Sequence, residues 1–172
     1  MITPYLHWSP EIADSAFIAD SAEVMGRVTI GADSSIWYQC VLRGDVHDIR
    51  IGERSNIQDH TVVHTSHHIT PCIIGNDVTV GHRVILHGCE VEDGCLVGMG
   101  SILMDRARLG SGCLLAAGSL VAEGKVLRCC YLYAGSPARE RRELSDEERA
   151  FLKASPAHYV TLSKTHIRTE SS

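Results

Sequence analysis

The chain has 172 residues, a formal net charge of −5, 44% hydrophobic residues and 22% charged residues. This length fits one domain with a sizeable core, and the acidic charge gives no electrostatic reason to expect binding to nucleic acid or an anionic membrane. No apolar run is long enough to cross a bilayer, and the N-terminal sequence lacks the basic start and apolar centre of a signal peptide, so we expect a cytoplasmic protein.

A hydrophobic residue, here called the anchor, recurs every six positions along most of the chain. Unbroken series run over residues 12–42 and 91–127, and shorter series over residues 51–63 and 74–86 lie between them. A period of six fits neither a helix nor an alternating strand, so each unit is predicted to be a short strand and a corner with one inward side chain. Stacked units of this kind form a β-solenoid with coils about 4.8 Å apart.

Six glycines directly follow an anchor, and we expect each of them to form a tight corner, because glycine adopts such conformations without steric cost. They are Gly31, Gly52, Gly75, Gly81, Gly98 and Gly110.

The six-residue repeat is interrupted in three places. The span 42–51 holds three extra residues, the span 63–74 holds five, and the span 86–91 is one residue short. Insertions in a solenoid become loops that project from its wall, often on the functional face. The polar stretches RGDVHD and HTSHHITPC fall in or beside these insertions, which makes them candidates for a site.

The seven cysteines follow no zinc-binding spacing. We expect them to be small buried side chains that stay reduced, and the adjacent Cys129 and Cys130 are the pair that could behave differently.

The six-residue repeat ends near Leu127, and a helical pattern follows. Ser145 and Glu148 form a capping box with further acidic residues in the first turn. Pro156 is expected to break this helix and to start a second segment. We therefore divide the chain into a solenoid domain over residues 1–135 and a C-terminal helical segment over residues 136–172 that packs on it.

The sequence contains, in this order, the motifs LRGD, SNIQDHTVVH, IGNDVTVGHRVILHGC, LVGMGSIL, AAGSLV and GSPAR. Together, over residues 12–160, they resemble the γ-class carbonic anhydrase-like family of the transferase-hexapeptide superfamily. The resemblance implies an all-β solenoid, a left-handed parallel β-helix with three hexads per coil and a C-terminal α-helical appendage, assembled as a homotrimer. The period alone does not supply the handedness.

Three faces per coil give the polar residues definite positions. Arg43, His64 and His87 each lie one residue past an anchor of one face and are expected to form an outward ladder on successive coils. His82 lies two residues past an anchor of another face, above Asp59. His82 is therefore poorly placed to meet His64 and His87 within one chain, whereas a neighbouring subunit can supply its own His82 to that pair.

The resemblance assigns His64, His82 and His87 as ligands of Zn²⁺. Three imidazoles and an open position are typical of catalytic zinc, which lowers the pKa of bound water to about 7. Fe²⁺ or Co²⁺ could occupy the same ligands. Taken singly, each histidine would be an ordinary solvated side chain.

The resemblance also implies supporting roles. Arg43 and Asp59 would form a salt bridge between subunits, Asp45 would belong to the same network, and Gln58 would hydrogen-bond the bound water or bicarbonate. Tyr159 resembles a family tyrosine that reaches toward the site, although core packing is an alternative role for it. For the other four, the alternative is that they are ordinary polar residues exposed on the wall of the solenoid.

Hydration of carbon dioxide also needs a route for the released proton. The best-studied archetype of the family has glutamates at the positions of Val46 and His67. Valine cannot carry a proton, whereas histidine with its ordinary pKa near 6.5 can. We hypothesise that His67, together with His68, replaces the acidic shuttle; the alternative is a loop with spare histidines.

Three functions remain open at this point. The leading one is a zinc-dependent lyase that interconverts carbon dioxide and bicarbonate. The second is a metal-bound trimeric binding or scaffold protein with little hydratase activity. The third is a coenzyme A-dependent acyltransferase, which the same solenoid also supports, although three histidines in phase argue against it.

Overall fold

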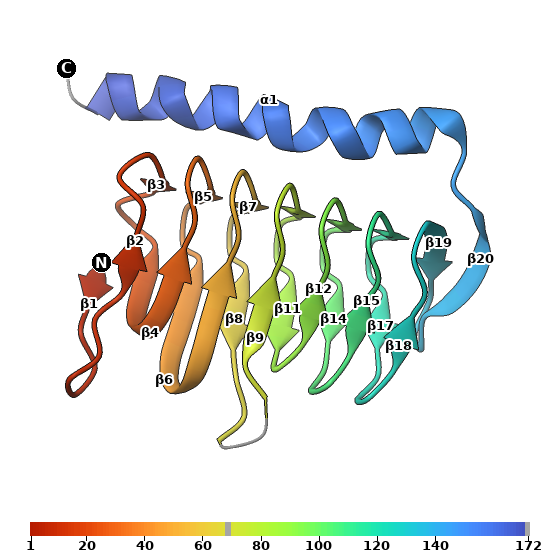
Figure 1. Cartoon of the computed structure of the whole chain (residues 1–172), viewed down its shortest axis with the longest axis horizontal. Coiled ribbons are helices and arrows are strands. Elements are labelled where there is room, and N and C mark those ends of the chain that lie inside the picture. The colour runs from red at the N-terminus through yellow and green to blue at the C-terminus, as the bar shows by residue number, and fades with distance from the viewer. Residues whose placement is uncertain (68–69, 171–172) are drawn as a thin grey trace.

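The computed structural model describes residues 1–67 and 70–170. Within these residues, short strands wind around one axis as a parallel β-helix of about seven turns, and a single helix lies along its side (Figure 1). The strands of successive coils stack into three flat faces, which we call wall 1, wall 2 and wall 3.

Wall 1 begins with the first halves of β4 (Glu23–Ile30) and β6 (Val41–Ile51), which bend around a corner into wall 2. Its other strands are β1 (Ile2–Thr3), β8 (Val62–His64), β11 (Ile85–His87), β14 (Ile102–Leu103) and β17 (Leu120–Val121). Wall 2 continues with β2 (Glu11–Ile12), β9 (Cys72–Ile74), β12 (Glu90–Val91), β15 (Arg108–Leu109) and β18 (Val126–Leu127).

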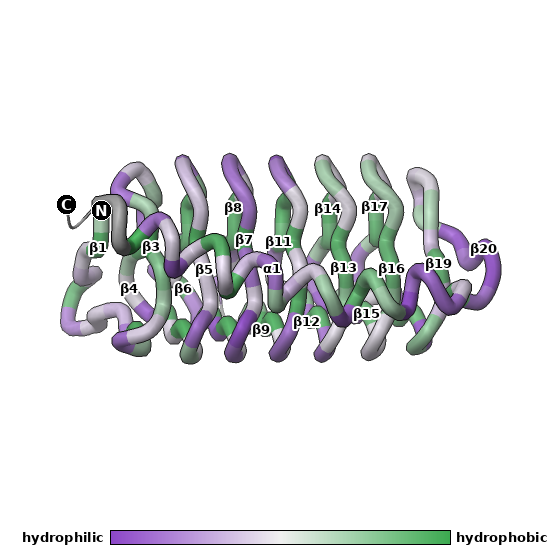
Figure 2. The backbone as a smooth tube through the Cα atoms, turned by 90° about the horizontal axis from the view of Figure 1, so that it is seen from above, coloured by the Kyte–Doolittle hydropathy of each residue, from purple (hydrophilic) through white to green (hydrophobic). Residues whose placement is uncertain are grey.

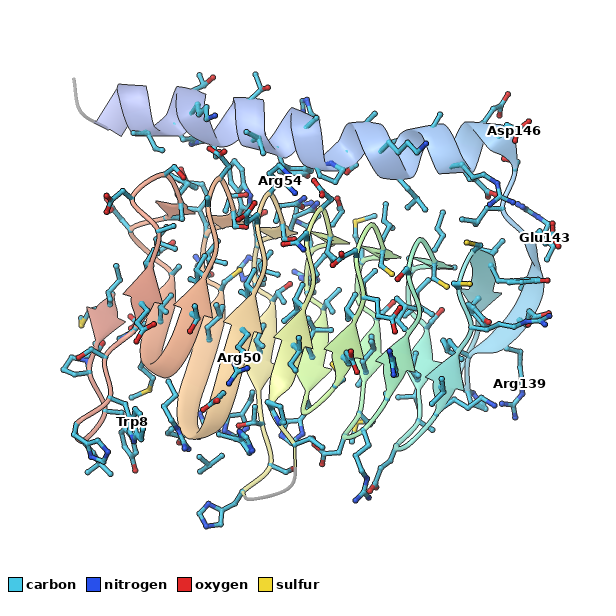
Figure 3. All side chains as sticks on the ribbon, in the orientation of Figure 1. Trp8, Arg50, Arg54, Arg139, Glu143 and Asp146 are labelled. Atoms are coloured by element: carbon cyan, nitrogen blue, oxygen red, sulfur yellow. The ribbon has the colours of Figure 1, made fainter. Side chains whose placement is uncertain are left out.

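Wall 3 faces the helix and is parallel except at its last edge. Its strands are β3 (Phe17–Ile18), β5 (Ser35–Ile36), β7 (Asn56–Ile57), β10 (Thr79–Val80), β13 (Leu96–Val97), β16 (Leu114–Leu115), β19 (Tyr131–Ala134) and β20 (Arg139–Glu143). The strand β20 pairs antiparallel with β19 and closes the last coil. Figure 3 shows Arg139 and Glu143 at the two ends of β20, before the chain turns to the helix.

Most hexads bury two side chains, the anchor and the residue two positions before it. In one unit, Val97 and Cys95 are both buried. The expectation of one inward side chain per unit is therefore wrong, because side chains two apart on a strand point to the same face. The second position is small, and it holds the buried cysteines Cys40, Cys72, Cys89, Cys95 and Cys113.

The cysteines behave as expected from the sequence. Burial raises the pKa of the Cys40 and Cys113 thiols to about 11, so both stay protonated at neutral pH. Cys129 and Cys130 are the exposed pair.

The glycines after the anchors have a different role from the one expected. The left-handed backbone conformation occurs two residues later, at corner positions such as Arg83 and Gly100. At Gly98, an added Cβ would lie 2.6 Å from the carbonyl oxygen of Leu115 on the next coil. Close stacking of coils, rather than the corner itself, therefore requires glycine at this position.

The helix α1 (Asp146–Glu170) packs on wall 3 and contacts β3, β5 and β10 (Figure 1). The capping box is present, since the Ser145 hydroxyl accepts a hydrogen bond from the Glu148 amide at 3.2 Å and Glu148 accepts one from the Ser145 amide at 2.8 Å. Among the described residues, no helix has both the length and the apolar character to cross a membrane.

The prediction that Pro156 ends the helix is wrong. The helix continues through Pro156, which is buried together with Ser155. The Ser155 hydroxyl lies 2.9 Å from the Thr79 hydroxyl on wall 3. Packing on the wall therefore holds the helix where proline alone would favour a break.

Candidate metal site

Wall 1 brings His64 and His87 side by side. The two residues are in register at the ends of β8 and β11. Nδ1 of His64 lies 3.2 Å from Nε2 of His87. Both rings are partly buried, and the ladder expected from the sequence is confirmed for this pair.

A carboxylate contacts the outer nitrogen of each ring. Nε2 of His64 lies 3.1 Å from Oδ1 of Asp45, and Nδ1 of His87 lies 3.0 Å from Oδ1 of Asp105. Metal-binding histidines commonly donate their second ring nitrogen to a carboxylate in this way. The two nitrogens that face each other are therefore the ones left to bind an ion.

The spacing of these two nitrogens fits a tetrahedral zinc ion. Zn–N bonds of about 2.0–2.1 Å at tetrahedral angles separate two ligand nitrogens by about 3.3 Å, and the pair here is 3.2 Å apart. Burial lowers the pKa of His64 below its ordinary value, and this effect outweighs the opposing hydrogen bond with Asp45. The neutral imidazole that a metal requires is therefore favoured.

His82 lies elsewhere in the chain, on the corner that follows β10 of wall 3. Its Nδ1 is 2.8 Å from Oδ2 of Asp59, and its side chain is 45% exposed. In the part of the chain that the structure describes, no group of three or more histidine, cysteine, aspartate or glutamate side chains could hold a metal ion. One chain thus supplies two of the three assigned ligands as a pair and presents the third to solvent.

Arg43 pairs within the chain with Asp45, at 2.5 Å between Nη1 and Oδ2. Burial alone would raise the pKa of Asp45, but the hydrogen bonds from Arg43 and His64 outweigh it and hold that pKa below its ordinary value. Asp45 is therefore an ionised link between Arg43 and His64. The assigned bridge from Arg43 to Asp59 concerns two subunits and stays a prediction.

Gln58 is buried on wall 3 and held in place by a polar chain that reaches the helix. Its Nε2 donates to Oδ1 of Asn56 at 3.0 Å, and Nδ2 of Asn56 donates to the Thr79 hydroxyl at 3.0 Å. The role assigned to the side chain of Gln58 stays a prediction.

Tyr159 on α1 packs edge-on against Trp37, with ring centroids 5.7 Å apart. Burial, and after it the negative charge of Asp59, raise the pKa of the Tyr159 hydroxyl. The side chain therefore belongs to an aromatic cluster and is also within electrostatic reach of Asp59, the partner of His82.

His67 is exposed in a turn that follows β8, at the last described residue before position 68. His68, the other half of the hypothesised proton shuttle, lies outside the described residues. The structure places His67 on the loop that follows the ligand candidate His64, and its role stays a hypothesis.

Sequence reasoning missed Asp105. This residue lies two positions past the anchor Leu103, on the coil after His87. His82 and Asp59 also lie two positions past their anchors, so this shared position in the repeat could have identified Asp105.

Comparison with solved structures defines the class of the fold. A hexapeptide transferase family protein from Anaplasma phagocytophilum matches with a TM-score of 0.91 and 47% identity, covering 95% of this chain and 96% of that one. A Bacillus cereus protein whose name assigns it to the acetyltransferases matches with a TM-score of 0.94 and 44% identity, covering 96% of this chain and 95% of that one. The protein is thus a left-handed hexapeptide-repeat β-helix, as the resemblance implied.

Curated relatives define the family. Protein YrdA of Escherichia coli is 46% identical over 166 residues, which are 93% of this chain and 90% of YrdA. The carbonic anhydrase of Geobacillus kaustophilus is 46% identical over 160 residues, 93% of this chain and 87% of its own. The chain belongs to the γ-class carbonic anhydrase-like family.

The family also contains longer proteins. Gamma carbonic anhydrase 2, mitochondrial, of Arabidopsis thaliana is 43% identical over 168 residues, and the chain spans 60% of its length.

No protein-family model matches the chain. An N-acyltransferase of Bacillus cereus, AntD, has a TM-score of 0.70 at 20% identity, which shows the shared fold alone.

Proposed function

We propose that the protein is a zinc-dependent carbonic anhydrase-like lyase that interconverts carbon dioxide and bicarbonate at a site between subunits of a homotrimer. The observation that supports this most is the His64 and His87 pair, whose facing nitrogens lie 3.2 Å apart while a carboxylate contacts each outer nitrogen. The names of the relatives from Geobacillus kaustophilus and Arabidopsis thaliana support the same reaction. We infer a cytoplasmic location from the sequence.

The third ligand in this proposal is His82 of a neighbouring subunit. His82 is 45% exposed on its corner, so it is accessible to another chain. Wall 1 beside the pair carries exposed apolar side chains, which favours burial against a second copy. They are Val62, Ile85 and Met104. Figure 2 colours the backbone by hydropathy and shows hydrophobic residues, the buried anchors included, along β14 and β17 of this wall.

Zinc held by three imidazoles would lower the pKa of a bound water to about 7 and so supply a nucleophile at neutral pH. Fe²⁺ or Co²⁺ are alternative occupants of the same ligands. The protein orients the two rings through Asp45 and Asp105. It also contributes the polar side chain of Gln58, whose amide nitrogen donates a hydrogen bond to Asn56. His67 accepts the released proton.

The test is to measure zinc content and carbon dioxide hydration together. Wild-type protein is expected to bind about one zinc per chain and to accelerate hydration, and His82→Ala is expected to lose both. His60→Ala is the matched control, because His60 is also a corner histidine, next to Asp59, and is expected to keep both. Zinc without hydration would instead favour the binding or scaffold protein, and acetyl-coenzyme A turnover without metal would favour the acyltransferase.

The proton role of His67 has its own test. His67→Ala is expected to slow hydration about tenfold or more in weak buffer, whereas concentrated imidazole buffer should restore the rate, because an external base then accepts the proton. An equal rate for wild type and variant in weak buffer would refute this role and leave the zinc site unaffected.

A further inference from the structure

The site contains a carboxylate to which neither the motifs nor the relatives assign a role. Asp105 follows β14 on wall 1, one coil beyond His87. Its side chain is 17% exposed, and its two oxygens have different partners. Oδ1 lies 3.0 Å from Nδ1 of His87, and Oδ2 accepts a hydrogen bond of 2.7 Å from the Ser66 hydroxyl.

The second contact links Asp105 to the inserted loop. Ser66 and Thr70 form a bridge at the neck of the loop, and the Thr70 hydroxyl donates to the carbonyl oxygen of Gly88 at 2.7 Å. Gly88 directly follows His87 in the chain. These contacts connect the ring and the backbone of His87 to the neck of the loop. The ring is connected through Asp105 and Ser66, and the backbone through Thr70.

The backbone beside His87 leaves room for this carboxylate. Gly88 has a φ of +53°, and a Cβ added there would overlap Oδ1 of Asp105 and approach the Thr70 hydroxyl to 2.7 Å. Glycine at this position thus satisfies two requirements, a left-handed backbone and open space for Asp105.

The contact also determines which nitrogen of His87 is free. An ionised carboxylate can only accept hydrogen bonds, so the proton of the neutral ring must be on Nδ1. Nε2 then has a lone pair, and Nε2 is the atom that faces His64 at 3.2 Å. The other tautomer would place a proton where the metal has to bind.

We propose that Asp105 is a positioning residue for metal binding: it fixes the Nδ1–H tautomer and the orientation of His87 and couples that ring to the neck of the inserted loop. This inference rests on the proposed function, since it names a determinant of metal affinity at the same site. Removal of such an outer partner typically weakens metal binding 10–100-fold.

The chain provides a matched control. Glu123 occupies the phase of Asp105 one coil further along, two residues past the anchor Val121, but it is 58% exposed and pairs with Arg106 rather than with a histidine. Asp105→Asn and Glu123→Gln therefore remove the same charge from equivalent corners, and only the first affects His87.

The test combines zinc titration against a competing chelator with nitrogen-15 spectra of the histidine rings in metal-free protein. Wild type and Glu123→Gln are expected to show His87 as the Nδ1–H tautomer with equal zinc affinity. Asp105→Asn should shift His87 toward the Nε2–H tautomer and weaken zinc binding 10–100-fold, and Asp105→Glu should restore part of both.

An unchanged tautomer and affinity in Asp105→Asn would overturn the proposal, as would an equal loss in Glu123→Gln. Loss of zinc together with loss of the fold or of the oligomer, followed by circular dichroism and sedimentation, would show a general structural role and would also overturn it. If wild type binds no zinc, the proposed function fails, but the tautomer spectra of metal-free protein still decide whether Asp105 fixes the ring.

Discussion

Glycine has two distinct uses in this solenoid, and the structure separates them residue by residue. At Gly98 the backbone conformation is ordinary, but the next coil is so close that an added Cβ would lie 2.6 Å from the carbonyl oxygen of Leu115. At Gly94 φ is +68°, and no atom lies within 4 Å of an added Cβ. The first glycine permits coil stacking, and the second permits a left-handed corner.

Substitution by alanine should distinguish these two uses. Gly94→Ala is expected to lower the free energy of unfolding by about 1–2 kcal/mol, the typical cost of a left-handed conformation for a residue with a Cβ. Gly98→Ala should cost about 3 kcal/mol or more, because backbone on two coils must move apart. Urea unfolding of both variants measures the difference, and an equal cost would show that the close approach is not a constraint.

At the scale of the elements, α1 depends on its N-terminal cap and on wall 3. Glu148 accepts hydrogen bonds from Arg142 and the Ser145 amide, and these interactions lower the pKa of Glu148 to about 2. Packing of Ser155 and Pro156 on the wall holds the middle of the helix. The sequence pattern predicted the cap correctly, because capping is local, and placed a break at Pro156 wrongly, because the packing is not local.

The cap gives the helix a defined pH dependence. The pKa of Glu148 is lower in the folded protein than its ordinary 4.5, so its contribution is fully present above about pH 4.5 and is lost as the pH falls toward 2. Glu148→Gln should therefore be less stable than wild type at pH 7, and the two should converge near pH 2. Melting temperatures across this range test the expectation, and a constant difference would contradict it.

Ser145→Ala tests the other half of the same cap. Loss of the hydroxyl that accepts the Glu148 amide should cost about 1 kcal/mol. The loss should persist at low pH, where the contribution of Glu148 has gone. Thermal unfolding near pH 2 and at pH 7 separates the two halves of the cap, and no loss at either pH would show that the hydroxyl does not stabilise the helix.

At the scale of the whole molecule, the repeat and the family motifs predicted the β-helix, the stacking of His64 on His87 and the separation of His82 from them. The placement of the histidines follows from their phase in the repeat once the family resemblance supplies three hexads per coil. The second inward position and Asp105 were missed although the strand period and the phase indicate them. The contacts of Asp105 with His87 and Ser66 could not be predicted, because they depend on the path of neighbouring coils. Wall 1 presents only two of the three assigned ligands, and in the proposed function the third comes from another chain.

Assembly should therefore be separable from folding. Ile85→Glu introduces a charge on the exposed apolar part of wall 1, where Ile85 is 39% exposed. If the protein forms the proposed trimer, this variant should yield folded monomers that do not bind zinc. Val126→Glu is the control, because Val126 is 64% exposed on wall 2 and should leave the trimer intact. Sedimentation velocity with circular dichroism distinguishes the two, and a zinc-loaded Ile85→Glu monomer would contradict the shared site.

The most direct measurement of the central claim is complementation between two inactive chains. His64→Ala and His82→Ala should each bind no zinc, but unfolding and refolding them together in equal amounts should form mixed trimers. Each mixed trimer has one junction with an intact His64 and His87 pair facing an intact His82, so about a quarter of the wild-type zinc content and hydration activity should return. No recovery in mixed trimers confirmed by mass spectrometry, or full zinc binding by either variant alone, would contradict a site shared between subunits.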